Sequence, residues 1–370
     1  MTIIDEVLAA LASEDHVMLA TIIATSGSTP ASALSKMLVK EGGDVSVGSV
    51  GGGCMEGDVL LHASRLYGGG RAEILSFELT EDNVEHGLVC GGSLDVLIEP
   101  IVQSDAPLFR QLKTICDRGD DAVLITRLRS DGIVQEKRVN VVSPTHDLGK
   151  AESPTVDSHS ATLESSIVRS HHRQQTIRIK VEDDELILEP IAGTPQLIIF
   201  GGGHVSKYLS RTASMAGFRV TIVDDREKYS NPRRFPEAAY THVLPLEDAV
   251  RQVNISASTY VVIVTRGHGY DETILEQILT TDAKYIGMIG SRRKILTAYE
   301  HLLQRGTTME QLHRVHAPVG IEIGAVTAEE IAVSIVAELI HLRRGGVVAP
   351  GHKSDSMSAL FALLTARTPV

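Results

Sequence analysis

The sequence predicts an α/β protein with a Rossmann-like, doubly wound parallel sheet in its C-terminal region and a β-rich α+β region before it. Two observations predict the parallel sheet. The apolar run Leu197–Phe200 leads into a glycine turn, and a second apolar run ends at Asp224, about 20 residues beyond that turn. Strands buried on both faces are continuously apolar, and glycine lets the backbone of a turn approach a ligand closely. We therefore expect strand, glycine turn, helix and strand, in that order.

Two further strands extend this pattern. The apolar runs Tyr260–Val264 and Lys284–Ile289 are each followed by glycine and then by a helical pattern, which predicts repeated βα winding. A capping box, Thr327–Glu330, predicts the start of a last apolar helix that ends near Arg344 and a pair of glycines.

Length and composition limit the class of protein. A chain of 370 residues with 43% hydrophobic and 22% charged residues is long enough for two or three domains with their own cores. The net charge of −12 repels phosphate backbones, so we expect no nucleic-acid partner. No apolar run approaches the ~20 residues that span a bilayer, and no signal peptide is recognisable. Three scattered cysteines suit a reducing compartment, so we expect a cytoplasmic protein without a membrane partner.

Three regions differ in composition. Residues 1–101 are rich in glycine, residues 102–192 form a β-rich middle region, and residues 193–370 alternate strand and helix. Within the middle region, the polar stretch at about 143–175 has almost no apolar periodicity, which predicts a long loop or a flexible, disordered insertion.

The middle region has features of a degenerate repeat of the first. His16–Thr21 is similar to Asp121–Thr126, and Ser93–Ile101 is similar to Asp184–Ile191, where both apolar runs contain Glu-Pro. We interpret these pairs as a duplicated β-rich unit whose second copy lacks the glycine triplet. Chance similarity is the alternative.

The glycine turn of the C-terminal region is the first candidate site. Gly201 and Gly203 lie just before a helix whose N-terminal amides favour an anion. Asp224 occupies the place of the acidic residue that binds ribose hydroxyls in dinucleotide sites, and Asp225 beside it would repel a 2′-phosphate, which favours NAD over NADP. Ser206 stands where the dinucleotide motif has its third glycine. The alternative is a doubly wound domain that keeps this shape without the ligand.

Other loops should reach the same edge of the sheet, because ligands of doubly wound sheets bind at the carboxyl ends of the strands. These loops contribute Arg266, His268, Ser291, Arg292 and Arg293. An arginine pair beside a glycine loop suits phosphate. His204 and His268 would titrate near neutral pH, and the alternative for His204 is a cap of its own helix.

A glycine run in the first region is the second candidate site. It leads into a predicted helix through Gly51, Gly52, Gly53, Cys54 and Glu56. Unpaired amides at a helix N-terminus stabilise a thiolate, so Cys54 is a candidate nucleophile or soft metal ligand. Cys90 also lies beside glycines, whereas Cys116 has the position of an inert helix-face residue. The alternative for each cysteine is a small buried hydrophobe, and the spacing does not predict a structural zinc site.

Polar residues near the first strands form a third candidate group. Ser26–Pro30 and Lys36 offer hydroxyls, amides and an ammonium, which suit phosphate. A plain turn between two strands is the alternative.

Taken in order along the chain, these motifs resemble the XdhC/CoxI family of accessory proteins for molybdenum hydroxylases such as xanthine dehydrogenase. The resemblance covers nearly the whole chain. It rests on Gly48–Glu56, Cys90–Gly92, Phe200–His204, Val223–Arg226, Arg233–Pro236, Val264–His268, Ile289–Arg293 and Gly320–Gly324. Ala31 and Leu34 depart from the family pattern, which commonly has an arginine and a glycine at those places, and an anion contact is therefore in doubt.

The resemblance implies an XdhC/CoxI domain at residues 1–101, an XdhC Rossmann-like domain at residues 193–370, and a cofactor chaperone rather than a turnover enzyme. Such a protein would bind the molybdenum cofactor (molybdopterin), support its sulfuration with a cysteine desulfurase, and deliver it to a xanthine dehydrogenase-type hydroxylase. Molybdopterin is an anionic, phosphate-bearing dithiolene with a soft metal, to which thiolate, amides and lysine are complementary.

The resemblance also implies site residues and an assembly. The expected cofactor-binding residues are Cys54, Gly51, Gly52, Gly53, Glu56, Lys36, Cys90, Gly201, Gly203, His204, Asp224, Asp225, Arg226, Arg266, His268, Ser291, Arg292 and Arg293. Cys54 is the expected molybdenum contact, in a cleft between the two modules, and we expect a homodimer.

Two enzymatic functions are the alternatives. The glycine turn and Asp224 suit an NAD(P)-dependent oxidoreductase, although no acid–base constellation accompanies them. A nucleotidyl transferase that acts on the pterin phosphate is the other, although the sequence has no dedicated Mg²⁺ cluster.

Overall fold

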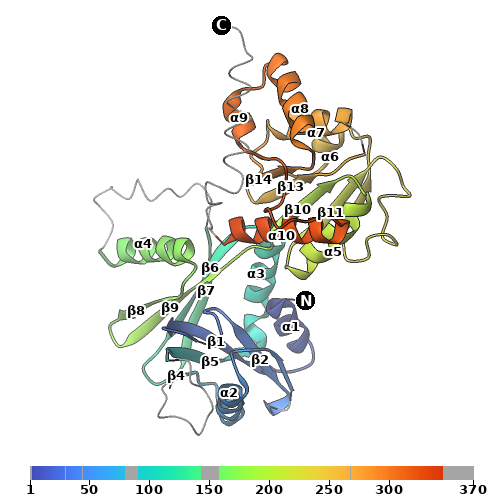
Figure 1. Cartoon of the computed structure of the whole chain (residues 1–370). Helices are drawn as coiled ribbons and strands as arrows, with labels where there is room; N and C mark the ends of the chain where they lie inside the picture. The colour runs from blue at the N-terminus through green and yellow to red at the C-terminus, as the bar shows by residue number, and fades with distance from the viewer. Residues whose placement is uncertain are drawn as a thin grey trace. The chain divides into compact units, whose positions relative to one another are not determined.

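The computed structural model describes residues 2–29, 31–43, 45–79, 91–142, 158–266 and 268–344 (Figure 1). The side chains of Glu41, Cys54, His268 and residues 158–162 are outside this description. The chain divides into two compact units, Met1–Gly193 and Thr194–Val370. Within the described ranges, no helix has both the length and the apolarity that crossing a membrane requires.

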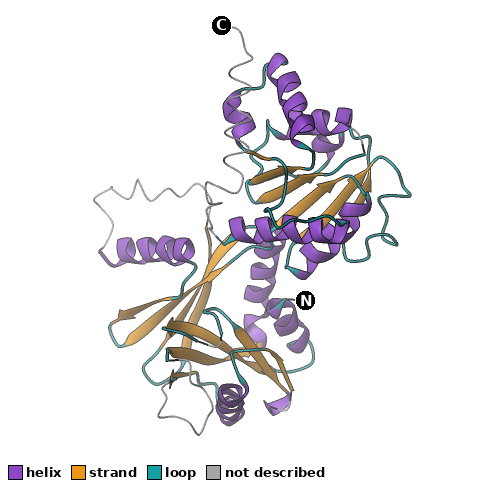
Figure 2. Ribbon diagram, in the orientation of Figure 1, coloured by secondary structure: helices purple, strands orange, loops and turns teal. Residues whose placement is uncertain are grey.

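Unit 1 contains two antiparallel sheets with their own helices (Figure 2). The first half consists of α1 (Ile3–Ala10), β1 (His16–Ser26), β2 (Lys36–Lys40), β3 (Val45–Gly48), α2 (Gly53–Leu66), β4 (Glu73–Glu78) and β5 (Ser93–Val102). The second half consists of α3 (Ala106–Arg118), β6 (Asp121–Leu128), β7 (Val134–Val142), α4 (Ser158–Arg173), β8 (Ile177–Val181) and β9 (Asp184–Ile191). Short 3₁₀ turns, η1 (Glu41–Gly43) and η3 (Gln103–Asp105), lie between elements.

The two sheets share their strand order and register. The order β3-β2-β1-β5-β4 corresponds to β7-β6-β9-β8 with one additional strand, β3. Leu19 pairs with Glu99 in the first sheet as Leu124 pairs with Glu189 in the second. Each strand pair has a helix on the equivalent face, because α2 packs against β1 and β5 while α4 packs against β6 and β9. The residues that motivated the repeat interpretation therefore occupy equivalent places in the two sheets.

Reciprocal ion pairs join the two halves of unit 1. Lys36 on β2 contacts Glu189 on β9 with Nζ 2.7 Å from Oε1, and Lys137 on β7 contacts Glu99 on β5 with Nζ 3.2 Å from Oε2. None of these four side chains is more than 13% exposed. Removing one partner of a buried pair leaves an uncompensated charge, so these pairs fix how the halves of unit 1 pack.

The expectation of a loop or disordered insertion at about 143–175 is wrong for its C-terminal part, where α4 forms. The Ile167 side chain of α4 is buried, and the Ser170 hydroxyl donates to the carbonyl of Leu188, 3.2 Å away. The buried face of α4 includes serines, so apolar periodicity alone misses it. The remainder of that prediction, 143–157, lies outside the described residues.

Unit 2 is a parallel six-stranded sheet with helices on both faces (Figure 2). Its elements are β10 (Gln196–Phe200), α5 (His204–Met215), β11 (Arg219–Asp224), β12 (Tyr240–Val243), α6 (Ala249–Gln252), β13 (Thr259–Ile263), α7 (His268–Ile278), β14 (Tyr285–Met288), α8 (Arg292–Gln304), α9 (Met309–His313), β15 (Val315–His316) and α10 (Ala328–Arg343). The strand order β12-β11-β10-β13-β14-β15 is that of the dinucleotide-binding Rossmann fold. The predicted fold class is confirmed.

Two apolar layers hold unit 2 together. One layer packs β10, β13 and β14 against α7 and α8, and the other packs the opposite face of the sheet against α5 and α10. Thr327 caps α10 as the sequence predicts, with its side chain accepting from the amide of Glu330. The strand order reverses between β10 and β13, and ligands of such sheets bind at this switch point.

Candidate functional site

The carboxyl edge of the parallel sheet gathers the predicted site residues of unit 2. Gly201 and Gly203 follow β10, Asp224 ends β11, Arg266 follows β13, and the run beginning at Ser291 follows β14. His268 begins α7, and its side chain lies outside the described residues. The sequence pattern therefore predicted correctly which loops lie at this edge of the sheet.

The glycine turn at this edge is crowded by the protein's own backbone. Gly201 has φ +105°, and a Cβ there would lie 2.4 Å from the carbonyl oxygen of Val264. A Cβ on Gly202 would lie 1.9 Å from the carbonyl oxygen of Tyr229. Both residues must be glycine because neighbouring chain segments pass this close, and no ligand is needed to explain them.

Asp224 has all its hydrogen-bond positions engaged within the protein. Its side chain is 1% exposed. Oδ2 accepts from the amide of Gly202 at 2.8 Å and from Nη2 of Arg226 at 3.0 Å, while Oδ1 accepts from the Arg226 amide at 3.0 Å and from its Nε at 2.8 Å. The carboxylate therefore holds the glycine turn, and the ribose contact expected of Asp224 stays a prediction.

The ionisation of Asp224 follows from these contacts. Burial opposes its charged form, but the hydrogen bonds from the Arg226 guanidinium and from the Gly202 and Arg226 amides outweigh burial, so its pKa lies below the ordinary value. The same pairing raises the pKa of Arg226. Both groups stay charged near neutral pH and form a permanent internal ion pair.

The segment after β11 covers the turn from a second side. Arg234 donates from Nε to the carbonyl of Gly202 at 3.0 Å and from Nη2 to that of Gly203 at 3.1 Å. The Arg226 guanidinium stacks 3.8 Å from the centre of the Tyr229 ring. The Ser206 hydroxyl donates to the carbonyl of Gly201, which is a reason for serine where the dinucleotide motif has glycine.

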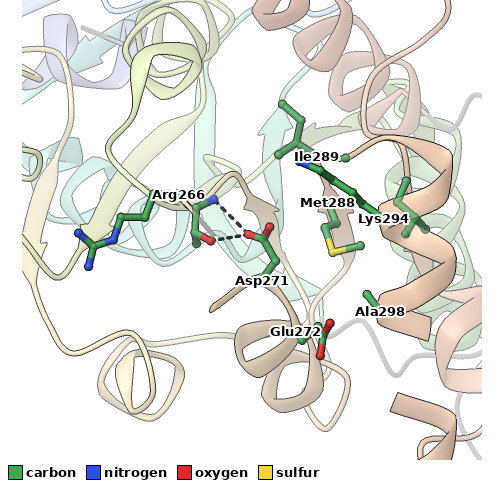
Figure 3. A pocket seen from close by; sticks show the side chains of 10 residues that line it. Arg266, Asp271, Glu272, Met288, Ile289, Lys294 and Ala298 are labelled. Atoms are coloured by element: carbon green, nitrogen blue, oxygen red, sulfur yellow. Dashed lines mark hydrogen bonds between the residues drawn. The ribbon is translucent and has the colours of Figure 1, made fainter. Parts of the chain in front are cut away.

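Asp225 and Arg266 connect the loops on either side of the turn. Arg266 Nη2 lies 2.6 Å from Oδ2 of Asp225, and the two side chains are 42% and 22% exposed. The Arg266 side chain extends away from the pocket residues labelled in Figure 3. The guanidinium that we expected to bind phosphate therefore already has a protein carboxylate as its partner.

His204 lies in an exposed cluster at the start of α5. Gly203 is the N-cap of α5, so the interpretation of His204 as the cap is wrong. The ring of His204 meets that of Tyr208 edge-on, with 5.3 Å between centroids. The Tyr208 hydroxyl bonds to Glu329 in the first turn of α10, which raises the Tyr208 pKa and lowers that of Glu329.

A pocket of about 250 Å³ opens between α7 and α8, beyond the carboxyl ends of β13 and β14 (Figure 3). It is lined by Thr265, Arg266, Asp271, Glu272, Met288, Ile289, Gly290, Lys294, Ile295 and Ala298. Of these residues, the sequence pattern had indicated Arg266 alone as a site residue. Thr265, Ile289 and Gly290 belong to motifs of the family resemblance but were not expected to be site residues, and no motif contains the remaining lining residues.

The first turn of α8 carries three exposed cations, Arg292, Arg293 and Lys294, of which Lys294 lines this pocket. Ser291 is the N-cap of α8, and its hydroxyl accepts from the amide of Lys294 at 3.4 Å. Among the described residues, no ion pair holds Arg292, Arg293 or Lys294. Cations at a helix N-terminus oppose the helix dipole, so helix stability does not account for this run.

In unit 1 the glycine run leads into α2 as predicted. Gly52 is the N-cap without a side-chain hydrogen bond, and Cys54 is the second residue of the helix. Glu56 accepts a hydrogen bond of 2.5 Å from the Ser49 hydroxyl. Gly51 has φ +139°. These residues sit where the sequence placed them, and the Cys54 side chain lies outside the described residues.

The other predicted groups of unit 1 differ in their outcome. Lys36 is engaged with Glu189 and with the Thr21 hydroxyl, 2.8 Å from its Nζ, so its ammonium already has protein partners. Cys90 lies outside the described residues. Cys116 is buried, and burial raises its pKa to about 11, with smaller contributions from neighbouring carboxylates. Across the described ranges, no group of three or more His, Cys, Asp or Glu side chains is placed to hold a metal ion.

Comparison with known proteins decides the family. Residues 197–339 match the family model described as the XdhC Rossmann domain, and residues 10–78 match the XdhC and CoxI family. The chain belongs to the XdhC and CoxI family. Both segments of this XdhC-family chain occur in the order that its motifs predict.

Two relatives and one solved structure match different shares of the chain. A protein of Bacillus subtilis (strain 168), named as a probable subunit of xanthine dehydrogenase, is 26% identical over 341 residues, 91% of this chain and 96% of that protein. The "Uncharacterized protein YqeB" of Escherichia coli (strain K12) is 31% identical over 165 residues, 43% of this chain, and the match spans 30% of that protein. A crystal structure described as a xanthine dehydrogenase from Bacillus halodurans superposes with a TM-score of 0.73 at 25% identity, covering 96% of this chain and all of that one.

Proposed function

We propose that this XdhC-family protein is an accessory factor that binds the molybdenum cofactor, supports its sulfuration and delivers it to a xanthine dehydrogenase-type hydroxylase. The names of the nearly full-length Bacillus relative and of the solved homologue support the connection with xanthine dehydrogenase. A cysteine desulfurase partner, a homodimer and a cofactor cleft between the modules stay predictions.

One observation carries the cofactor part of this proposal: Lys294, which lines the unit 2 pocket, has no ion-pair partner among the described residues, and neither do Arg292 and Arg293 in the same helical turn. Molybdopterin ends in a phosphate, and phosphate binds to lysine and arginine through charge-assisted hydrogen bonds. The pocket behind the rim is lined on one side by apolar side chains, Met288, Ile289 and Ile295. A lysine beside apolar side chains can bind a phosphate whose attached organic part contacts those apolar side chains.

Unit 1 offers a group that suits the metal end. Cys54 lies in the first turn of α2, where helix amides stabilise a thiolate. Thiolate is a soft ligand. When bound, the cofactor supplies a redox-active metal held by dithiolene sulfur, and the role of Cys54 is to hold a sulfur atom close to that metal.

The test is retention of the cofactor by purified protein on a desalting column, with molybdenum measured by mass spectrometry and the oxidised pterin by fluorescence. We expect wild type to retain both signals and Cys54→Ala to retain less, by about tenfold or more. Cys116→Ala is the matched control, because that thiol is buried and poorly ionised. Equal retention by wild type and Cys54→Ala removes the thiol role, and no retention by either removes the cofactor proposal.

The oxidoreductase alternative loses its main support in the structure. Asp224 gave that hypothesis its ribose contact, and this carboxylate holds Gly202 and Arg226 instead. Calorimetric titration with NAD should therefore give no binding heat, and a clear binding isotherm would restore the alternative.

A further inference from the structure

We infer that the pocket between α7 and α8, and not the glycine turn after β10, receives the phosphate-bearing end of the cofactor. This inference rests on the proposed function and specifies its geometry. Sequence reasoning placed the anion at the glycine turn, because Rossmann sites bind pyrophosphate there.

The Gly202 amide of the glycine turn is already engaged and is not free to donate to an anion. The Gly202 amide donates to Asp224, and the carbonyls of Gly202 and Gly203 accept from Arg234. A buried carboxylate thus already holds the position where an incoming phosphate would accept from this amide. The Gly202 amide can therefore bind a phosphate only if it gives up its hydrogen bond to Asp224.

The pocket beyond β13 and β14 differs from the glycine turn because it contains a lysine without an ion pair in the described part of the chain. Its two carboxylates are already engaged: Asp271 accepts from the Thr265 amide at 3.2 Å and from the Thr265 hydroxyl, and Glu272 accepts from His301 at 3.1 Å and from Arg305 at 3.4 Å. The dashed lines at the Asp271 carboxylate in Figure 3 mark hydrogen bonds of this residue. Lys294 lines the same pocket and has no ion pair among the described residues, so a positive charge is available there.

The apolar wall limits what the anion is attached to. Met288, Ile289, Ile295 and Ala298 line the pocket beside Lys294. Met288 lies between Asp271 and the α8 residues in Figure 3. Apolar side chains favour contact with a ring rather than with a second charged group. The pocket therefore suits a phosphomonoester whose organic part contacts aliphatic side chains.

The charge-reversal variant Lys294→Glu tests the assignment. We expect it to weaken binding of the molybdenum cofactor by about tenfold to a hundredfold, the range for loss of a charge-assisted hydrogen bond. The matched control is Lys207→Glu, an exposed lysine in the first turn of α5 beside the glycine turn. Dissociation constants come from quenching of the pterin fluorescence. Both lysines are exposed and lie in the first turn of a helix, where the dipole favours glutamate, so neither variant should have a lower melting temperature than wild type.

A phosphate-free probe identifies which end of the cofactor the pocket holds. Cofactor treated with phosphatase should bind wild type and Lys294→Glu with equal, weaker affinity, because the group that Lys294 contacts is gone. If Lys207→Glu weakens binding and Lys294→Glu does not, the anion lies at the glycine turn and the inference is overturned. It is also overturned if the phosphatase-treated cofactor still separates wild type from Lys294→Glu. A wild type that binds neither probe instead contradicts the proposed function itself.

Discussion

The two glycine runs of this protein look alike in sequence and differ in structure. Both precede a helix, and both place a glycine at the N-cap without a side-chain hydrogen bond. In unit 2, carbonyl oxygens of the same chain crowd Gly201 and Gly202. In unit 1, a Cβ on Gly53 would meet nothing within 4 Å.

This difference separates two reasons for glycine in a turn. A crowded glycine serves packing, because a side chain would collide with the protein's own backbone. A glycine in open space and without left-handed backbone has no such need, and close approach of a ligand is then a reason worth testing. The comparison therefore assigns a packing role to Gly202, whereas Gly53 in unit 1 and Gly203 in unit 2 have no such packing reason.

The largest expected effect follows substitution of the crowded glycine. Gly202→Ala places a methyl group 1.9 Å from the Tyr229 carbonyl oxygen, so the backbone must shift and the hydrogen bond to Asp224 is strained. We expect the free energy of unfolding to fall by roughly 3–5 kcal/mol, measured by urea denaturation.

The adjacent glycine supplies the control. A Cβ on Gly203 meets nothing within 4 Å, so Gly203→Ala should cost only the preference for glycine over alanine at the N-cap of α5, about 1 kcal/mol. Equal losses in the two variants would mean that crowding is not the reason for glycine at position 202.

A smaller effect should follow removal of the carboxylate that holds this turn. Asp224→Ala leaves the Gly202 amide and the Arg226 guanidinium without their buried acceptor, which costs about 2–4 kcal/mol. Asp225→Ala is the matched control, because its ion pair with Arg266 is partly exposed and worth about 0–1 kcal/mol. A similar loss in both variants would contradict the role assigned to Asp224.

Acid titration tests the contribution of Asp224 in a second way. Because the pKa of Asp224 is lowered in the folded state, its contribution to stability is complete above the unfolded value of about 3.9 and is lost as pH falls through the folded value. Wild type should therefore lose more stability than Asp224→Ala as pH falls below about 4. Parallel acid curves for the two proteins would rule out this linkage.

Sequence reasoning predicted the parallel sheet well because the signal is physical and local. Strands such as Leu197–Phe200 are buried on both faces and must be apolar throughout, whatever the rest of the chain does. The helix α4 was missed because part of its buried face is serine, for example Ser170, whose hydroxyl bonds to a carbonyl of β9. That bond depends on tertiary structure and leaves no periodic signal.

The candidate site was predicted less well, since side-chain partners depend on segments far apart in the chain. Asp224 occupies its motif position, but the motif does not contain Arg226 as a competing donor. Lys36 looked free for phosphate, although its partner Glu189 lies 153 positions further along the sequence. Lys294 belongs to no motif, and its place in a pocket became visible once α7 and α8 were packed on the sheet.

The smallest effect on stability, and the sharpest test of the comparison, is expected at the open glycine. Gly53→Ala adds a methyl group at the start of α2 in open space, so the free energy of unfolding should change by no more than about 0.5 kcal/mol. If cofactor approaches the backbone of this turn beside Cys54, the same methyl group should weaken its retention by about tenfold, since 1.4 kcal/mol of lost contact gives that factor. Gly57→Ala, one turn further along α2 and also in open space, controls for changes in the helix itself. Unchanged retention in Gly53→Ala would mean that the unit 1 glycine run has no close ligand, and the contrast between the two turns would then reduce to packing alone.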